Sequence, residues 1–164
     1  MTRIHLRLVP PEDLQQLAQS LMPPSVAEHT LPSALPPDFV ARRALQHLAD
    51  GKPPQWCSTY YMVRNSDGVI VGSCGFKDAP AGRRVEIGYG VAPEARRQGV
   101  ATAAVRALLA IGAASGEVDQ ILAQVNPDNI ASNGVVRHCG FTALDIRCDD
   151  DGEQLMQWLA TVGG

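Results

Sequence analysis

The chain has 164 residues, of which 45% are hydrophobic and 19% are charged, and its formal net charge is −3. A chain of this length is typical of one domain with a single core, and its composition is that of an ordinary globular protein. The mild negative charge argues against nucleic acid as the main partner. We therefore expect one domain over residues 1–164 that does not bind nucleic acid.

Cysteine usage and the N-terminus indicate where the protein works. The cysteines form no Cys-x-x-Cys pair, so we expect four small buried residues in a reducing compartment, Cys57, Cys74, Cys139 and Cys148. No Cys–His pair has zinc-ligand spacing, so no metal is expected. The N-terminal residues lack a signal-peptide apolar region, and the most apolar window, 99–116, contains Arg106 and is typical of a core helix. These features predict a cytoplasmic protein without a membrane partner.

Proline divides the first third of the chain into short elements, because proline lacks an N–H and restricts the residue before it. Nine of the twelve prolines precede residue 55. Alternating apolar residues predict a strand near residues 4–8. Residues 11–21 and 37–49 have helical patterns, and residues 22–36 form a predicted Pro-rich loop.

Beyond residue 56 the pattern changes to a period of two, which is typical of strands. Strands are predicted at residues 57–64, 69–76 and 84–91. The sequence Asn-Ser-Asp-Gly at 65–68 has the residues that a hairpin turn with positive φ requires. Together with a second turn near 78–83, these segments predict an antiparallel meander.

The last third alternates between helix and strand signals. The predicted elements are a helix at 98–115 stopped by Gly116, a strand at 120–126, a helix at 129–138, and strands at 141–148 and 154–159. The order of all these elements predicts an α+β domain with a mixed sheet.

The loop between the strand at 84–91 and the long helix is the most informative segment. It reads Arg96-Arg97-Gln98-Gly99-Val100-Ala101-Thr102, and a basic loop at a helix N-terminus offers free N–H groups and a positive dipole end to a phosphate. It fits neither the P-loop nor the Rossmann pattern. The alternative is an ordinary solvated helix start with two surface arginines.

Two motifs resemble one known family. Arg96-x-x-Gly99-x-Ala101 matches the Arg/Gln-x-x-Gly-x-Gly/Ala coenzyme A pyrophosphate loop of the Gcn5-related N-acetyltransferases (GNAT family), and Asn129-x-x-Ser132 followed by Gly140-Phe141 resembles the family's downstream signature. The resemblance covers residues 57–147 well and the N-terminal third in outline. It implies the acyl-CoA N-acyltransferase fold, a splayed central sheet of about seven strands flanked by four helices, with acetyl-CoA as cosubstrate.

Glu86 is the candidate general base. On an extended strand Glu86, Gly88 and Gly90 share one face, which suggests a ligand channel beside a carboxylate. Acetyl transfer to an amine requires the ammonium to lose a proton, and a carboxylate can accept it directly or through water. The family often has its base at this strand position. The alternative is a surface carboxylate paired with Arg83 or Arg84.

The strand end is the candidate thioester site. Two glycines within a strand suggest either a bulge or close approach of a ligand to the backbone. The resemblance implies that backbone groups near Gly90 and Val91 bind the pantetheine arm and that one N–H polarises the thioester carbonyl. The alternative is a bulge with no ligand role.

The turn into the second motif carries the candidate acid. Asp128 or Asn129 is a plausible helix N-cap, and the resemblance adds contacts of Asn126 and Asn129 with the cosubstrate. The tyrosine that many members use to protonate the departing thiolate is replaced by Val136. In this respect the chain resembles the branch of the family that contains ribosomal-protein N-terminal acetyltransferases of the RimJ/RimL type. In that branch a serine at this position is a candidate acid, so Ser132 is the candidate here.

These observations lead to one functional hypothesis. We expect an acetyl-CoA-dependent N-acetyltransferase in which a primary amine attacks the thioester directly in a ternary complex, with Glu86 and Ser132 as catalytic residues. The expected cosubstrate-binding residues are Gly90, Val91, Arg96, Arg97, Gln98, Gly99, Val100, Ala101, Thr102, Asn126 and Asn129. The alternatives are a non-catalytic acyl-CoA-binding or regulatory domain and a plain structural domain. The sequence does not identify the acceptor, which is an amine of a small molecule or of a protein. A homodimer is a further expectation.

Overall fold

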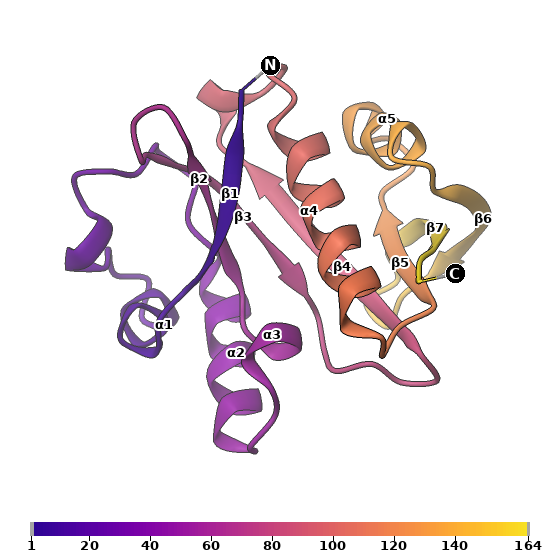
Figure 1. The fold of residues 1–164 in the computed structure, drawn as a ribbon, viewed down its shortest axis with the longest axis horizontal. Coiled ribbons are helices and arrows are strands. Elements are labelled where there is room, and N and C mark those ends of the chain that lie inside the picture. The colour runs from indigo at the N-terminus through magenta and orange to yellow at the C-terminus, as the bar shows by residue number, and fades with distance from the viewer. Residues whose placement is uncertain (1, 164) are drawn as a thin grey trace.

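The computed structural model describes residues 2–163 and contains one seven-stranded sheet of order β1-β2-β3-β4-β5-β7-β6 (Figure 1). The strands are β1 (Ile4–Leu8), β2 (Tyr60–Arg64), β3 (Ile70–Phe76), β4 (Arg84–Val91), β5 (Gln120–Val125), β6 (Thr142–Cys148) and β7 (Gln154–Thr161). The helices are α1 (Pro11–Ala18), α2 (Asp38–Ala49), α3 (Pro54–Cys57), α4 (Val100–Ser115) and α5 (Ile130–His138), with short 3₁₀ helices η1 (Pro24–Val26) and η2 (Pro93–Ala95). The predicted α+β class and mixed sheet are confirmed, with five helices instead of four.

The sheet separates between β4 and β5. These strands are parallel and pair from Arg84 opposite Gln120 to Ile87 opposite Ala123. Both strands continue beyond that point, but no pairing between them follows. In the part of the chain that the structure describes, residues 88–91 of β4 therefore have no strand partner on the β5 side. This separation is the predicted splay, and it exposes backbone groups of β4 in the middle of the sheet.

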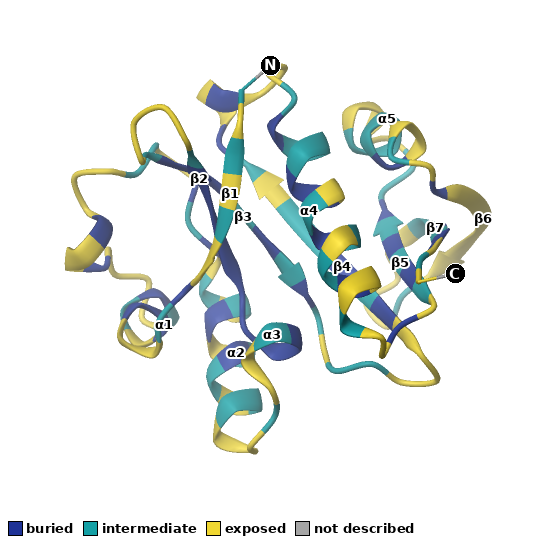
Figure 2. Cartoon of the chain, in the orientation of Figure 1, coloured by how far each residue is buried: buried dark blue, intermediate teal, exposed yellow. Residues whose placement is uncertain are grey.

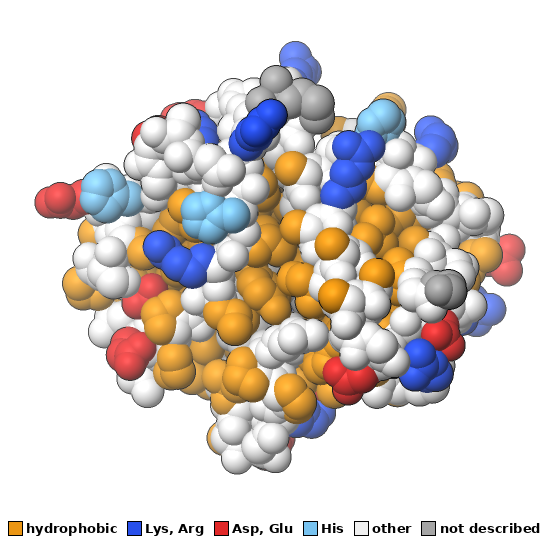
Figure 3. Space-filling view, in the orientation of Figure 1, with side chains coloured by type: hydrophobic (Ala, Val, Ile, Leu, Met, Phe, Trp, Pro, Cys, Tyr) orange, Lys and Arg blue, Asp and Glu red, His pale blue; other side chains and the backbone are white. Residues whose placement is uncertain are grey.

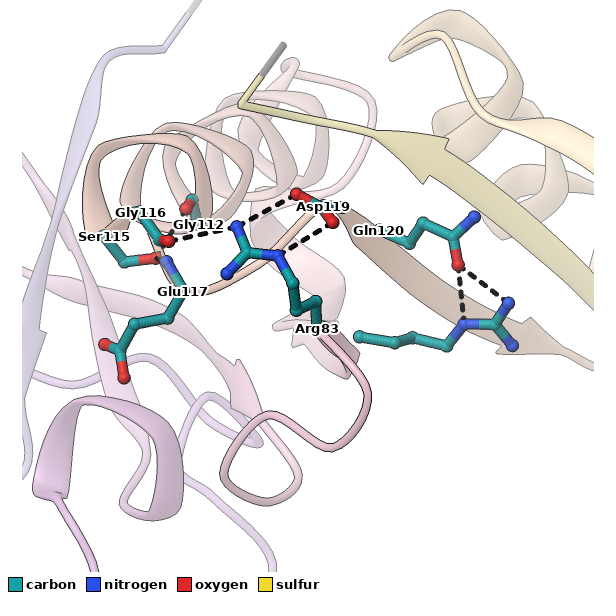
Figure 4. Close-up of polar contacts among 8 residues, drawn as sticks. Arg83, Gly112, Ser115, Gly116, Glu117, Asp119 and Gln120 are labelled. Atoms are coloured by element: carbon teal, nitrogen blue, oxygen red, sulfur yellow. Dashed lines mark hydrogen bonds and ion pairs between the residues drawn. The ribbon is translucent and has the colours of Figure 1, made fainter.

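The paired end of β4 and β5 is held by two arginines (Figure 4). The Arg83 guanidinium donates to both carboxylate oxygens of Asp119, at 2.8 and 3.0 Å, and to the carbonyl oxygen of Gly116 at 3.0 Å. The Arg84 guanidinium donates to Oε1 of Gln120 at 2.8 and 3.0 Å. Such exposed contacts add little to the free energy of unfolding, but they fix the register where the strands meet.

Helices cover the two faces of the sheet and create two cores (Figure 2). Side chains alternate along β2, so Tyr61 packs with α1 and α2 whereas Met62 packs on the α4 side. Helix α4 packs on the sheet through an apolar stripe in which Val100, Ala104 and Leu108 are buried. Hydrophobic side chains also gather across the middle of the face drawn in Figure 3, with charges of both signs around them.

The strand predicted at 57–64 is wrong at its N-terminal end. Residues Pro54–Cys57 form the short helix α3, and β2 begins at Tyr60. Pro54 occupies the first turn of α3, where its fixed φ favours the helix and its missing N–H is not needed. Ser58 is extended and ends the helix. The Pro-Pro pair therefore starts a helix and does not lead directly into a strand.

Left-handed residues shift two predicted helix boundaries. The helix predicted at 11–21 ends at Ala18, and Ser20 has a φ of 59°. The helix predicted from residue 98 begins at Val100, because Gly99 has a φ of 79° and is its N-cap. In the predicted hairpin turn at 65–68, Gly68 alone has a positive φ, of 74°.

The prediction of four buried cysteines is half wrong. Cys57 and Cys74 are buried, Cys139 is half-buried and Cys148 is exposed. Cys148 ends β6, an edge strand that is exposed along its whole length (Figure 2). Because side chains alternate between the two faces of a strand, neither face of β6 is covered. All four are free thiols, and burial raises the pKa of the Cys74 thiol. Between residues 2 and 163, no helix combines the length and apolarity that a membrane crossing requires.

A close approach of two strands makes Gly72 sensitive to substitution. A Cβ at Gly72 would lie 2.5 Å from the carbonyl oxygen of Gly90 and 2.8 Å from Sδ of Met62. We expect Gly72→Ala to lower the free energy of unfolding in urea by about 1–3 kcal/mol. Gly134→Ala is the matched control, since Gly134 lies in α5 with no atom within 4 Å of an added Cβ, and alanine there should add about 0.5–1 kcal/mol. Equal effects of the two changes would contradict the steric explanation.

Candidate active site

The loop before α4 carries a row of free backbone donors. In the described part of the chain, none of the N–H groups of residues 97–102 donates to a backbone or side-chain acceptor, and Ala103 is the first to do so, to Gly99 at 3.0 Å. Arg97 and Gly99 have φ values of 62° and 79°, and left-handed residues of this kind let successive N–H groups converge. The loop is held from the other side by the N–H of Thr2, which donates to the carbonyl oxygen of Gln98 at 3.0 Å. This geometry suits an anion at the positive end of the α4 dipole.

A pocket of about 450 Å³ lies beside this loop, between α2 and the strands β3 and β4. Its lining includes Gly88 and Gly90 on β4 and Arg96 at the start of the loop. A Cβ at Gly90 would meet no atom within 4 Å, and one at Gly88 would meet only Cε of Lys77, at 3.4 Å. The two glycines therefore leave the backbone of β4 accessible from the pocket, with no side chain over it. The alternative of a bulge at this point is wrong, because Gly90 pairs with Ser73 and Gly88 with Gly75 in regular register.

Glu86 lies next to this pocket on the same face of β4. Its carboxylate forms an ion pair with the Lys77 ammonium and accepts a hydrogen bond from Nε2 of Gln124 at 3.0 Å. The Glu86 side chain is 23% exposed, and it lines a smaller neighbouring cavity together with Lys77. The alternative that pairs Glu86 with Arg83 or Arg84 is wrong, since both arginines bind other partners.

Ser132 lies across the splay from β4 and is bound to it by a tyrosine. The Tyr89 hydroxyl lies 2.8 Å from Oγ of Ser132 and 3.2 Å from its carbonyl oxygen. Burial raises the pKa of Tyr89, so the phenol keeps its proton and can donate it in this hydrogen bond. Val136, at the position where many family members have a tyrosine, is fully buried in the core. The tyrosine hydroxyl at this site thus comes from β4. The sequence motif of α5 gave no indication of it, because Tyr89 lies in another segment of the chain.

Two asparagines build the turn from β5 into α5. Oδ1 of Asn129 accepts a hydrogen bond from the N–H of Ser132 at 3.1 Å, which confirms Asn129 as the N-cap. Oδ1 of Asn126 accepts from the N–H of Asp128 at 2.8 Å, and its Nδ2 donates to Glu153 at 3.3 Å. Both side chains hold Ser132 and its helix in place opposite β4.

The structure also assembles residues that sequence spacing did not connect. His47, Cys57 and Asp78 bring ligand atoms within 4.8 Å of one another, although they come from separate elements. The Lys52 ammonium already lies 3.0 Å from Asp78, and burial raises the pKa of the Cys57 thiol, which disfavours the thiolate that a metal needs. This cluster is therefore better explained by the lysine ion pair than by a metal.

The fold and the site define a class of protein. A mixed sheet that opens between its parallel strands, beside a helix start with free N–H groups, offers an open strand edge next to an anion site. The acetyltransferase (GNAT) domain family matches residues 3–142, so the chain belongs to the GNAT acetyltransferase family. No curated protein sequence matches the chain.

Several solved structures share the fold at low sequence identity. The RimL ribosomal L7/L12 alpha-N-protein acetyltransferase in complex with coenzyme A has a TM-score of 0.70 and 18% identity, with 99% of this chain and 96% of that chain covered. RimJ of Mycobacterium smegmatis in complex with CoA-disulfide has a TM-score of 0.66 and 20% identity, over 98% and 85% of the two chains. A chimera of the spermidine N-acetyltransferase SpeG from Vibrio cholerae and hSSAT has a TM-score of 0.67 and 13% identity, over 96% and 95%.

Proposed function

We propose that this protein transfers the acetyl group of acetyl-CoA to a primary amine by direct attack in a ternary complex, with residues 1–164 acting as one N-acetyltransferase domain. The observation that carries the proposal is the unpartnered edge of β4, which leads from the free N–H groups at the start of α4 to the 450 Å³ pocket. Solved relatives whose names include coenzyme A have the same fold. An anionic cosubstrate with a long neutral arm fits such a path.

The cosubstrate would be bound mainly by backbone groups. In this proposal the N–H groups of residues 97–102 bind the pyrophosphate, and Arg96 and Arg97 add charge. Arg96 also donates from Nε to the carbonyl oxygen of Val91 at 3.3 Å, so it connects the loop with the strand end. Gly90 and Val91 hold the pantetheine arm and polarise the thioester carbonyl. Asn126 and Asn129 would approach the arm from the α5 side.

Two side chains would handle the protons. Glu86 accepts the proton of the acceptor's ammonium group. If the acceptor lies over Gly88 and Gly90, a water molecule carries this proton to the carboxylate. The neutral amine then forms the new C–N bond as the C–S bond breaks. The Ser132 hydroxyl protonates the departing thiolate and regains a proton from the nitrogen, directly or through water, as that nitrogen becomes the amide. The Tyr89 hydroxyl lies 2.8 Å from Oγ of Ser132. When the phenol is the donor in this contact, the hydrogen of Ser132 is free for the sulfur. Much of the rate gain would come from positioning the amine and the thioester together.

The Tyr89 contact predicts a moderate catalytic loss. Tyr89→Phe should lower kcat about 2- to 10-fold, the worth of one lost hydrogen bond, with little change in the KM for acetyl-CoA. Because Tyr89 acts through Ser132, the same change made in a Ser132→Ala protein should lower kcat no further. Steady-state kinetics of the two single variants and the double variant measure this. Additive losses would show that Tyr89 does not act through Ser132.

Two further possibilities are tested alongside. A non-catalytic acyl-CoA-binding domain would use the same loop and strand edge without turning over the cosubstrate. A homodimer through β6 is supported by the exposed edge of that strand, which carries Leu144 and Ile146 at 44% and 51% exposure, and size-exclusion chromatography with light scattering measures it.

The decisive activity test is release of free thiol from acetyl-CoA by the purified protein with a panel of amines. We expect release that needs both the protein and an amine, together with a product 42 Da heavier by mass spectrometry, roughly the mass of an acetyl group that replaces a hydrogen. Binding of acetyl-CoA without thiol release for any amine would favour the binding domain.

A further inference from the structure

The charges around the 450 Å³ pocket are of one sign. Among the described residues, the charged side chains that line it are Arg43, Lys77 and Arg96, and no carboxylate does so. The carboxylate of Asp38 on α2, which could have attracted a cationic acceptor, is instead bound to Arg42 at 3.2 Å. A site with this lining repels a polycation and attracts an anionic group.

Arg43 is the lining cation that is available to a ligand. Lys77 is paired with Glu86, and Arg96 donates to the carbonyl oxygen of Val91. Within residues 2–163, by contrast, Arg43 makes no hydrogen bond or ion pair, and it is half-buried. A half-buried guanidinium without a partner is a strong binding group for a carboxylate or phosphate, because it can donate two parallel hydrogen bonds.

A second unpartnered group lies in the same wall. Ser58 is 4% exposed, and its Oγ has no hydrogen-bond partner in the described structure. Buried hydroxyls in proteins are nearly always hydrogen-bonded, so this hydroxyl, on a residue that lines the pocket, has unused capacity to bond a polar group that reaches it. The rim beside it is apolar, with Phe39 58% exposed and Leu35 and Val40 next to it.

We propose that the acceptor is a small amine that also carries an anionic group and an apolar body, as an apolar amino acid does, and that Arg43 binds the anionic group. This rests on the proposed acetyl transfer and names the substrate class. The volume suits such a molecule, since small-molecule sites span about 300–1,000 Å³. Arg43 on α2 would hold the anion while the amine points to the strand end near Gly90.

The test compares matched amines. Acetyl-CoA-dependent thiol release is measured with leucine, methionine and phenylalanine, with the amide and the decarboxylated amine of each, and with O-phosphoethanolamine and spermidine. We expect kcat/KM to be about 10- to 100-fold higher for the amino acid than for its amide or amine, the effect of one charge-assisted contact. A preference for O-phosphoethanolamine would assign the anion as a phosphate and contradict the apolar body of the acceptor.

Variants of Arg43 test whether this residue causes the preference for the carboxylate. Arg43→Gln should remove the preference for the carboxylate, lowering kcat/KM for the amino acid about 10- to 100-fold and leaving that for the amide unchanged. Arg43→Lys should keep part of the preference for the carboxylate. Arg42→Gln is the matched control, because Arg42 is the neighbouring arginine of α2 and does not line the pocket, and it should behave as the natural protein does.

Binding is also measured without turnover, by saturation-transfer NMR of the same amines with the protein–coenzyme A complex. The inference is overturned if spermidine or the amides are the better substrates, if Arg43→Gln has no effect, or if no anionic amine binds or reacts. In each case thiol release with another amine of the panel shows that the proposed function still stands. Absence of thiol release with every amine would instead contradict the proposed function itself.

Discussion

Replacing Glu86 with glutamine is expected to lower kcat by about 10²- to 10⁴-fold, because removal of a positioned general base has an effect of that size. Glu86 is a half-buried carboxylate on the face of β4 that also carries the bare positions Gly88 and Gly90. Glutamine keeps the shape of the side chain and a hydrogen bond with Gln124, so the fold and the affinity for acetyl-CoA should remain. Steady-state thiol release measures the change, and calorimetry measures the affinity.

The ion pair with Lys77 gives this prediction its control. Glu86 could serve only to neutralise Lys77, in which case Lys77→Met would harm the enzyme as much as Glu86→Gln. If Glu86 is the base, Lys77→Met should lower kcat far less, because the carboxylate stays in place. Equal losses in both variants, or a Glu86→Gln enzyme with near-normal kcat, would argue against the catalytic role.

Gly99→Ala is expected to raise the KM for acetyl-CoA about 10- to 100-fold, a loss typical of a small displacement of binding groups. Gly99 has a φ of 79°, which costs an alanine roughly 1–2 kcal/mol. Relief of that strain would move the N–H groups of residues 97–102, which have no other acceptor in the described chain. An added Cβ would also obstruct close approach of a phosphate.

Gly116→Ala is the matched control at the other end of α4. Gly116 has a φ of 71°, and no atom lies within 4 Å of an added Cβ. Its substitution should lower the free energy of unfolding by as much as Gly99→Ala does, while leaving the KM for acetyl-CoA unchanged. A rise in KM for both variants would mean that lost stability, and not lost phosphate contacts, explains the effect.

Local sequence signals predicted the elements that have strong periodicity or clear ends. The strand Arg84–Val91 has its predicted bounds, and the strand predicted at 120–126 is β5, where Ile121, Ala123 and Val125 are buried on one face. The N-cap at Asn129 also follows from residue type. Helix α3 was missed because a Pro-Pro pair can end one element or begin another, and only packing decides between them.

The candidate site was predictable where one segment makes it and unpredictable where two segments meet. The loop before α4 is local, so its sequence indicated the anion site. The pairing of Lys77 with Glu86, the contact of Tyr89 with Ser132 and the position of Arg43 in the pocket that β4 also lines depend on strand register and on how helices pack. One signal was available for Lys77, because it lies just after β3 in the hairpin with β4, and a register fixed by that turn places it beside Glu86.

The most direct test of the acetyl-CoA site is thermal unfolding of the pure protein with and without saturating acetyl-CoA. Ligand at about 100 times its Kd should add roughly 2.7 kcal/mol, which for a chain of this size raises the Tm by about 5–10 °C. We expect that rise in the natural protein and a much smaller one in Gly99→Ala at the same ligand concentration. No change of Tm at millimolar acetyl-CoA would contradict this expectation and leave the loop as an ordinary helix start.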